Sequence, residues 1–132
     1  NNIVLIQSTM ALSHSEIIIS LLKVILDQTD KISNNRIQLN NNFRIMIHKH
    51  KKILFNNIHS ESERTTLTNC KTAIEYISHY IDTHKSFQGN LLVLLQILCE
   101  YSILNKTSIR EWSYTTNIYN SSICHKLLLS LH

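Results

Sequence analysis

Hydrophobic residues recur along this chain with the period of an α-helix. Residues 42–58 and 60–84 carry an apolar side chain at every third or fourth position, and these side chains gather on one helix face. Residues 16–28 are apolar over more than half of the helix circumference, and residues 91–104 are apolar on almost every side, which predicts a central buried helix. Two further helices are predicted, over residues 3–12 and from residue 108 onward. A polar link is expected at residues 29–42, with a helical part that places Ile37 and Leu39 as the open alternative.

Three copies of the pattern Ser-x-x-Glu mark where helices are expected to begin. They start at Ser13, Ser60 and Ser108, and each precedes an apolar segment of helical period. In this capping box the Ser hydroxyl accepts a hydrogen bond from the amide three residues later, and the Glu carboxylate accepts one from the Ser amide. We therefore predict helix N-termini at these three serines. Gly89 followed by Asn90 predicts a further break and a further start.

Glycine and proline are nearly missing from the chain, which has one Gly and no Pro in 132 residues. β-Sandwiches and β-barrels need many tight turns, and these turns depend on Gly and Pro. Asn can take the left-handed conformation at helix ends, so Asn-rich links can replace Gly there. The composition therefore predicts an all-α protein. Its length suits one domain over residues 1–132, which we expect to be part of a larger chain.

The predicted helix starts are evenly spaced, and this spacing resembles that of a helical repeat. The intervals between the three boxes are 47 and 48 residues. Periods of about 40–47 residues with two or three helices are typical of HEAT and armadillo repeats. Residues 10–26 also look like the helix–turn–helix joint of such repeats. The resemblance covers two units and part of a third, and it implies a HEAT/armadillo-like array of antiparallel helix pairs. A compact antiparallel helix bundle is the alternative.

No pattern of catalytic or cofactor-binding residues is present. One Gly cannot build a phosphate-binding loop, and no Ser or His motif of a hydrolase or metalloprotease occurs. His48 and His50 are two positions apart, so on a helix they point about 160° away from each other and cannot share a metal ion. Cys70 and Cys99 fall at apolar positions, where Cys is usually a small buried hydrophobe. We therefore expect no enzyme activity, no cofactor and no metal.

The three cysteines and the lengths of the apolar runs bear on where the protein is found. Cys70, Cys99 and Cys124 are widely spaced and odd in number, which favours reduced thiols in an intracellular protein over a disulfide framework. No apolar run approaches the roughly 18 residues that cross a membrane, so no membrane span is expected.

One helix face has enough charge to indicate a binding surface. The formal net charge is +4, and four basic residues share the side of the 42–58 helix that lies opposite Phe43, Ile47 and Leu54. These four basic residues are Arg44, His48, Lys51 and Lys52. A local patch of this size suits an acidic segment of a protein partner, and we expect weak or no binding to nucleic acid. Phe55 at its margin is the only aromatic residue near this face, so base stacking is not supported.

These features favour a non-catalytic protein–protein interaction or scaffold module inside a larger intracellular protein or complex. A secreted helical ligand is the alternative of a different class. Cys99, Glu100 and Tyr101 form a stretch that is similar to one in short-chain four-helix cytokines, which implies a compact helical bundle. A viral Bcl-2-like regulator is a third alternative, although no Asn-Trp-Gly-Arg groove motif is present.

Overall fold

The computed structural model describes residues 13–59 and 62–131, and this part of the chain is helical with no strand. The prediction of an all-α fold is confirmed. The described helices are α2 (His14–Ile32), α3 (Arg36–Ile58), α4 (Glu63–Thr83), α5 (Leu91–Glu100), α6 (Lys106–Thr115) and α7 (Ile118–Ser130), with a short 3-10 turn η1 (Lys85–Phe87) before α5. The helix predicted over residues 3–12 lies outside the described residues.

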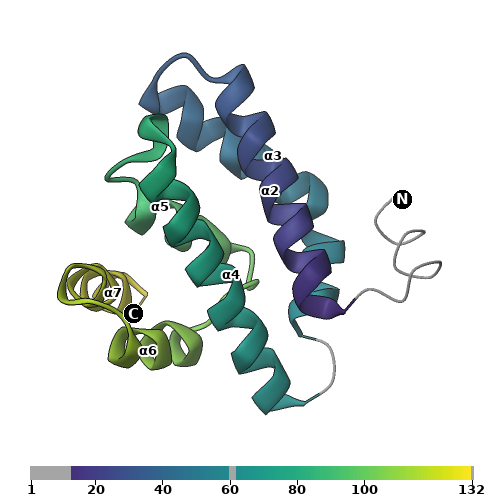
Figure 1. Ribbon diagram of the computed structural model, residues 1–132, viewed down its shortest axis with the longest axis vertical. Helices are drawn as coiled ribbons and strands as arrows, with labels where there is room; N and C mark the ends of the chain where they lie inside the picture. Colours follow the sequence, from purple (N-terminus) through teal and green to yellow (C-terminus); the bar gives the residue numbers. More distant parts are fainter. Residues whose placement is uncertain (1–12, 60–61, 132) are drawn as a thin grey trace.

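The helices pack around α4 and α5. Helix α4 contacts α2, α3, α5 and α6, while α5 contacts α3, α4 and α7. Figure 1 shows α2 and α3 on one side of α4, and α6 and α7 on the other. Each described helix contributes buried apolar side chains to one continuous core. Such burial is the main favourable term that holds the helices together.

Helix α5 confirms the prediction of a central buried helix over part of its range. Five of its ten residues are buried, and Glu100 is its only exposed residue. The prediction that this helix continues to Leu104 is wrong. The chain leaves the helix at Tyr101, and Ser102 takes a left-handed φ of 60°. Ile103 and Leu104 stay buried because the turn carries them back to the core, where both amides donate to the carbonyl of Leu98.

The first predicted cap is confirmed and the other two are wrong. The amide of Glu16 donates to the Ser13 hydroxyl at 3.3 Å, and the Ser13 amide donates back to the Glu16 carboxylate at 3.3 Å. Helix α4 begins at Glu63 with Ser62 as its N-cap, whose hydroxyl accepts from the Thr65 amide at 3.1 Å. Ser60 therefore does not cap this helix, and Ser60 itself lies outside the described residues.

The N-cap of α6 is Asn105 in place of the predicted Ser108. The Asn105 side chain accepts from the Ser108 amide at 2.9 Å, and Ser108 is the third helical residue and fully buried. Both errors have one cause: a second good capping residue lies within three positions, and sequence alone does not say which one has the extended backbone of a cap. The observed N-caps Ser13, Ser62 and Asn105 are 49 and 43 residues apart, so the even spacing is not observed.

The predicted polar link at residues 29–42 is much shorter than expected, because only residues 33–35 separate α2 from α3, and the alternative of a helical part that includes Ile37 and Leu39 is confirmed. Asn35 caps α3 by accepting from the Gln38 amide at 2.9 Å. Leu39 lies one helical turn before Phe43 and is buried beside it. Its burial outweighs the low helix propensity of the Asn residues that follow it.

The single helix predicted from residue 108 is also wrong, because the chain forms two helices there. Asn117 separates α6 from α7 and caps α7 by accepting from the Asn120 amide at 2.8 Å. Ile109, Trp112 and Leu127 are buried as expected. Tyr119, which a continuous helix would place on the same side, is 66% exposed because the chain changes direction before it.

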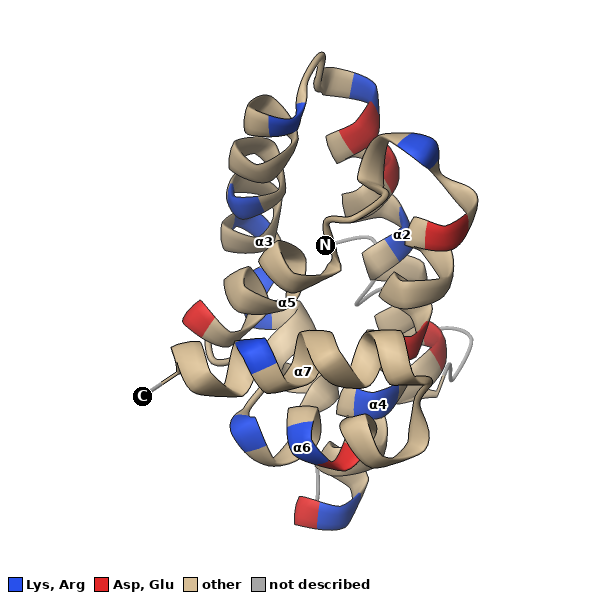
Figure 2. Cartoon of the chain, turned by 90° about the vertical axis from the view of Figure 1, so that its left-hand side faces the viewer, with Lys and Arg blue, Asp and Glu red and all other residues tan. Residues whose placement is uncertain are grey.

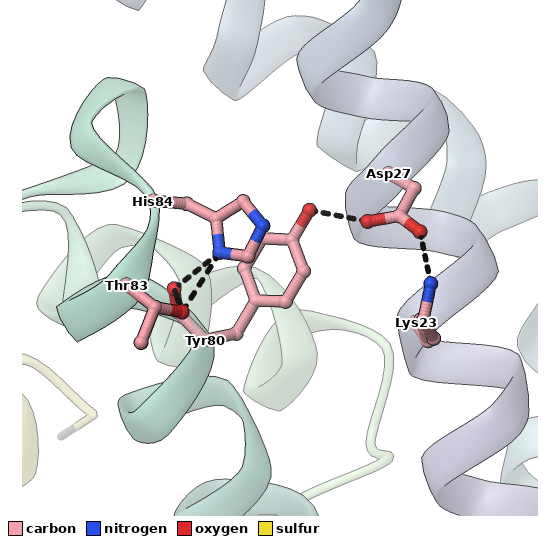
Figure 3. A network of polar contacts seen from close by, with 5 residues as sticks. All are labelled: Lys23, Asp27, Tyr80, Thr83 and His84. Carbon is pink, nitrogen blue, oxygen red and sulfur yellow. Dashed lines mark hydrogen bonds and ion pairs between the residues drawn. The ribbon is translucent and has the colours of Figure 1, made fainter.

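A polar network joins α2 to α4 at the surface of the core (Figure 3). The Tyr80 hydroxyl donates to the Asp27 carboxylate at 2.6 Å, and Lys23 donates to the same carboxylate at 2.7 Å. The Tyr80 ring stacks on His84, with ring centroids 3.6 Å apart. The hydrogen bond from Lys23 and then that from Tyr80 hold the pKa of Asp27 below its ordinary value of 3.8. Burial and the bond to Asp27 raise the pKa of Tyr80.

Replacing a core leucine of α5 should destabilise the protein far more than replacing a surface lysine. Leu94 is fully buried, so Leu94→Ala should lower the free energy of unfolding by about 2–5 kcal/mol through lost burial and a new cavity. Lys49→Ala, at an exposed position on α3, should change it by less than about 0.5 kcal/mol. Urea denaturation measures both, and similar values for the two variants would contradict the central position of α5.

Ser62 should contribute the N-cap of α4. Ser62→Ala should lower the free energy of unfolding by about 0.5–2 kcal/mol, because the Thr65 amide loses its acceptor. Thr68→Ala, at an exposed position inside the same helix, is the matched control and should be neutral or stabilising, since Ala favours the helix interior. A neutral effect of Ser62→Ala in thermal denaturation would show that α4 begins elsewhere.

The contribution of Asp27 to stability should depend on pH. Because its pKa is lowered by folding, the stabilisation is present above the unfolded-state pKa and is lost as the pH falls through the folded-state pKa. Asp27→Asn should therefore cost about 1 kcal/mol or less at neutral pH, since the carboxylate is partly exposed to solvent. The difference from wild type should begin to shrink below about pH 4, where the unfolded chain takes up a proton, and should be lost as the pH falls through the lower folded-state pKa.

Urea denaturation of both proteins across this pH range measures the difference. Asp82→Asn, at an exposed position on α4, is the matched control and should change stability little at any pH. A cost of Asp27→Asn that stays constant with pH would contradict the ionised hydrogen bond between α2 and α4.

Candidate protein-binding surface on α3

The four predicted basic residues all lie on the exposed side of α3. Arg44, His48, Lys51 and Lys52 are each exposed, and Figure 2 shows the Lys and Arg positions along this helix. The opposite side of α3 faces the core and buries Leu39, Phe43, Ile47, Leu54, Asn57 and Ile58. The helix is therefore divided as the sequence pattern indicates. We call the four residues the basic face, and its role in binding stays a prediction.

Helix α5 brings a carboxylate to the basic face. Arg44 forms an ion pair with Glu100, the exposed residue at the end of α5. Within residues 13–59 and 62–131 the other ion pair joins Lys23 to Asp27. Lys51 and Lys52 thus have no carboxylate partner in the described part of the chain. Exposed ion pairs contribute little to stability, so Arg44 and Glu100 mainly orient each other.

An aromatic ring from the turn after α5 lies against the middle of the basic face. The Lys51 ammonium is 5.7 Å from the centroid of the Tyr101 ring, and the His48 ring is 5.8 Å from the same centroid. A cation over an exposed aromatic ring gains about 0.5–1 kcal/mol. Tyr101 therefore holds both basic side chains close to the end of α5.

A surface hollow of about 460 Å³ opens between the C-terminal half of α3 and this turn. Its lining residues are Lys51, Lys52, Phe55, Asn56, Glu100, Tyr101 and Ser102. Phe55 is 39% exposed and stacks on His59 with centroids 4.3 Å apart. His59 Nε2 lies 2.8 Å from the carbonyl oxygen of Ile103, which joins the end of α3 to the residues that follow the turn. Two ammonium groups and two aromatic rings thus share one opening.

Sequence reasoning did not find the part of this hollow that comes from α5. Glu100, Tyr101 and Ser102 are about fifty residues from the basic face in the chain, and no sequence pattern links the two segments. The sequence pattern predicts that Phe55 lies at the margin of the basic face, and in the structure Phe55 lines the hollow beside Lys51 and Lys52. The contact between α3 and α5 is what brings these groups together.

A larger hollow of about 520 Å³ lies between the first turns of α4 and α6. It is lined by both Glu63 and Arg64, beside Ser62, Asn105 and Thr107. Its one positive and one negative charge cancel. The hollow at the basic face has two lysines against Glu100, so it keeps a net positive charge and is the better candidate for an acidic ligand.

The cysteines are free thiols. Burial raises the pKa of Cys99 and of Cys124 to about 11, and it also raises the pKa of Cys70. These thiols are protonated at neutral pH and are therefore poor nucleophiles.

His48 is exposed while His50 is half-buried, and burial lowers the pKa of His50. In the described ranges no three His, Cys, Asp or Glu side chains lie together as metal ligands would. None of the described helices combines the length and the apolar character needed to cross a bilayer.

Comparisons with known proteins give no further guide to function. No protein-family model, curated protein or solved structure shows a significant match to this chain.

Proposed function

We propose that this chain is a non-catalytic helical scaffold module that binds an acidic segment of a protein partner through the basic face. The observation that carries the proposal is the position of Lys51 and Lys52. Both are exposed, both line the hollow beside Phe55 and Tyr101, and neither has a carboxylate partner among the described residues. An acidic segment supplies the missing carboxylates, and its apolar side chains can cover the two rings.

The size and composition of the surface favour a protein ligand over a nucleic acid. Binding to duplex DNA draws its affinity from many lysine and arginine contacts to phosphates. Here Glu100 lies inside the surface and pairs with Arg44, which leaves few cations for phosphates. Partly exposed apolar area at Phe55 is of use to a peptide side chain and of little use to a phosphate backbone.

The pattern of helix contacts supports a repeat-like architecture for this module. Helices α2, α4 and α6 contact in succession, and so do α3, α5 and α7. The contacts α2–α3, α4–α5 and α6–α7 then form three pairs, which is how HEAT-like arrays stack. A compact bundle is the alternative, and the direct contact of α3 with α4 supports it.

The thiols support the remaining parts of the proposal. Three free cysteines, two of them buried, suit an intracellular scaffold and give the hypothesis of a secreted ligand no support. Their raised pKa values suit a structural role better than a catalytic one. We further propose that the module acts within a larger protein or complex, as scaffold modules commonly do.

Reversing two charges in the hollow should abolish most of the binding to an acidic peptide. The probe is a fluorescein-labelled peptide of ten residues rich in Glu, measured by fluorescence anisotropy. Lys51→Glu combined with Lys52→Glu should weaken binding by about tenfold or more, because two attractive contacts become repulsive. Lys85→Glu combined with Lys126→Glu makes the same change in net charge at exposed positions elsewhere and should have a much smaller effect.

The same assay with a duplex DNA probe tests the competing ligand. Binding of duplex DNA that is tighter than peptide binding and falls steeply with salt would contradict the proposal. If the two double variants weaken peptide binding equally, the basic face is not a specific binding site and only the net charge of the protein matters. Circular dichroism of each variant checks that the helices are retained.

A further inference from the structure

The exposed side of α3 carries a straight row of residues with the spacing of a helix–helix contact. Successive members of this row, which we call the α3 seam, are alternately four and three positions apart, and all of them are exposed. The members are Ile37, Asn41, Arg44, His48, Lys51 and Phe55. Residues with this spacing form a stripe nearly parallel to the helix axis, which is the surface that a second helix lying alongside would contact.

The chemistry of the seam changes along its length in a definite order. Ile37 is apolar and 75% exposed at one end, and Phe55 is apolar and 39% exposed at the other. Arg44, His48 and Lys51 lie between them. These three side chains remain exposed, although Arg44 pairs with Glu100 and the Tyr101 ring lies against His48 and Lys51. Ile37 and Phe55 are 18 residues apart, which is about 27 Å at the rise of an α-helix. The seam thus has two apolar ends and a basic centre.

We propose that the α3 seam binds an acidic amphipathic helix of a partner protein, an inference that rests on the proposed function above. The facing row of the partner helix has an apolar residue, then acidic residues, and then a second apolar residue. Charge complementarity assigns the acidic centre, and the exposed Ile37 and Phe55 assign the apolar ends. A helix of about 18 residues covers the whole row.

The spacing of the basic groups favours a helix over an extended peptide. Arg44, His48 and Lys51 follow one another at steps of about 6 and about 4.5 Å along the α3 axis. A helix repeats acidic residues at the same three- and four-residue steps on one face. An extended peptide places its side chains on one face about 6.6 Å apart, so it loses register with the row after two contacts.

Each end of the seam has a structural feature that suits the proposed helix. The end at Phe55 opens on the hollow lined by Lys52, Tyr101 and Ser102, which can receive an apolar side chain flanked by an acid. At the other end Arg36 donates to the Gln88 carbonyl at 2.6 Å, and this bond holds the first turn of α3 against the turn before α5. Ile37 is therefore presented on a helical turn whose position is fixed.

A second copy of this chain is a poorer occupant of the seam. Helix α2 carries Glu16, Asp27 and Asp30 on one side, but all three carboxylates are already engaged, and Glu16 accepts from Ser13 in the N-cap. Asp27 accepts from Lys23 and Tyr80, and Asp30 accepts from Ser86. Lys23 also lies between the acids on the same side. The acidic helix is therefore expected from a different protein.

The test compares two labelled synthetic helices of 18 residues by fluorescence anisotropy. The matched peptide has Leu at both ends and Glu at three central positions of one face, with Ala and Gln elsewhere. The control peptide has the same composition with its Glu residues moved to the opposite face. The matched peptide should bind about tenfold more tightly, because only it contacts the apolar ends and the basic centre together.

Single variants of the protein test the two ends of the seam. Ile37→Ser and Phe55→Ser should each weaken binding of the matched peptide by about fivefold and leave the control peptide unaffected. Ile45→Ser removes another apolar side chain, 62% exposed on the same helix but outside the seam, and should leave binding of both peptides unchanged. Ile37 is so exposed that its replacement should not prevent folding, and circular dichroism checks this for each variant.

The outcomes separate this inference from the proposed function. One outcome is that the two peptides bind with equal affinity and that Lys51→Glu with Lys52→Glu weakens the binding of both. This outcome would overturn the proposed helical ligand of the α3 seam, while the proposed function, binding of an acidic segment, would still be supported. If neither helical peptide binds, and the Glu-rich peptide does not bind either, both proposals are overturned. Sedimentation showing a dimer of this chain that Ile37→Ser dissociates would overturn the seam in favour of a second copy.

Discussion

Burial of α5 is the constraint on which the rest of this structure depends. The helix has ten residues, and only Glu100 among them is exposed, so other helices must cover it on nearly every side. Helices α3, α4 and α7 provide this cover. Because α5 is short, its end and the turn at Ser102 reach the surface beside α3. The same packing that completes the core thus builds the candidate binding surface.

In the function that we propose, the selectivity of the basic face comes from the arrangement of its side chains. Its cations are exposed, and an exposed ion pair contributes little to the free energy of unfolding, so the fold does not depend on them. Their proposed role in binding rests on their order along one helix and on the rings of Tyr101 and Phe55 beside them. A ligand must match both the charge and the apolar positions, which is a stricter requirement than net charge alone.

Sequence patterns predicted the helices better than their ends. Apolar periodicity identified the buried faces of α3 and α4, and it placed Arg44, His48, Lys51 and Lys52 together on one exposed side. The apolar arc of α2 is wider than the face that it buries, because Ile19 and Val24 are exposed. The Ser13 cap was also found. The caps at Ser62 and Asn105 were missed because a neighbouring Ser fits the same pattern, and the choice between neighbours depends on how each helix packs. The Asn-rich start of α3 was predicted only as an alternative because its local propensity disfavours a helix, and the burial of Leu39 outweighs that propensity.

The sequence by itself determined the all-α class, the amphipathic faces and the basic side of α3, because these follow from local periodicity and from the near-absence of Gly and Pro. Only the tertiary structure decided which helices touch. That decision placed Glu100 on Arg44, Tyr101 on Lys51 and the hollow beside Phe55. The physical reason is that these contacts join segments about fifty residues apart, and their positions depend on how apolar faces pack in three dimensions, which no local pattern records.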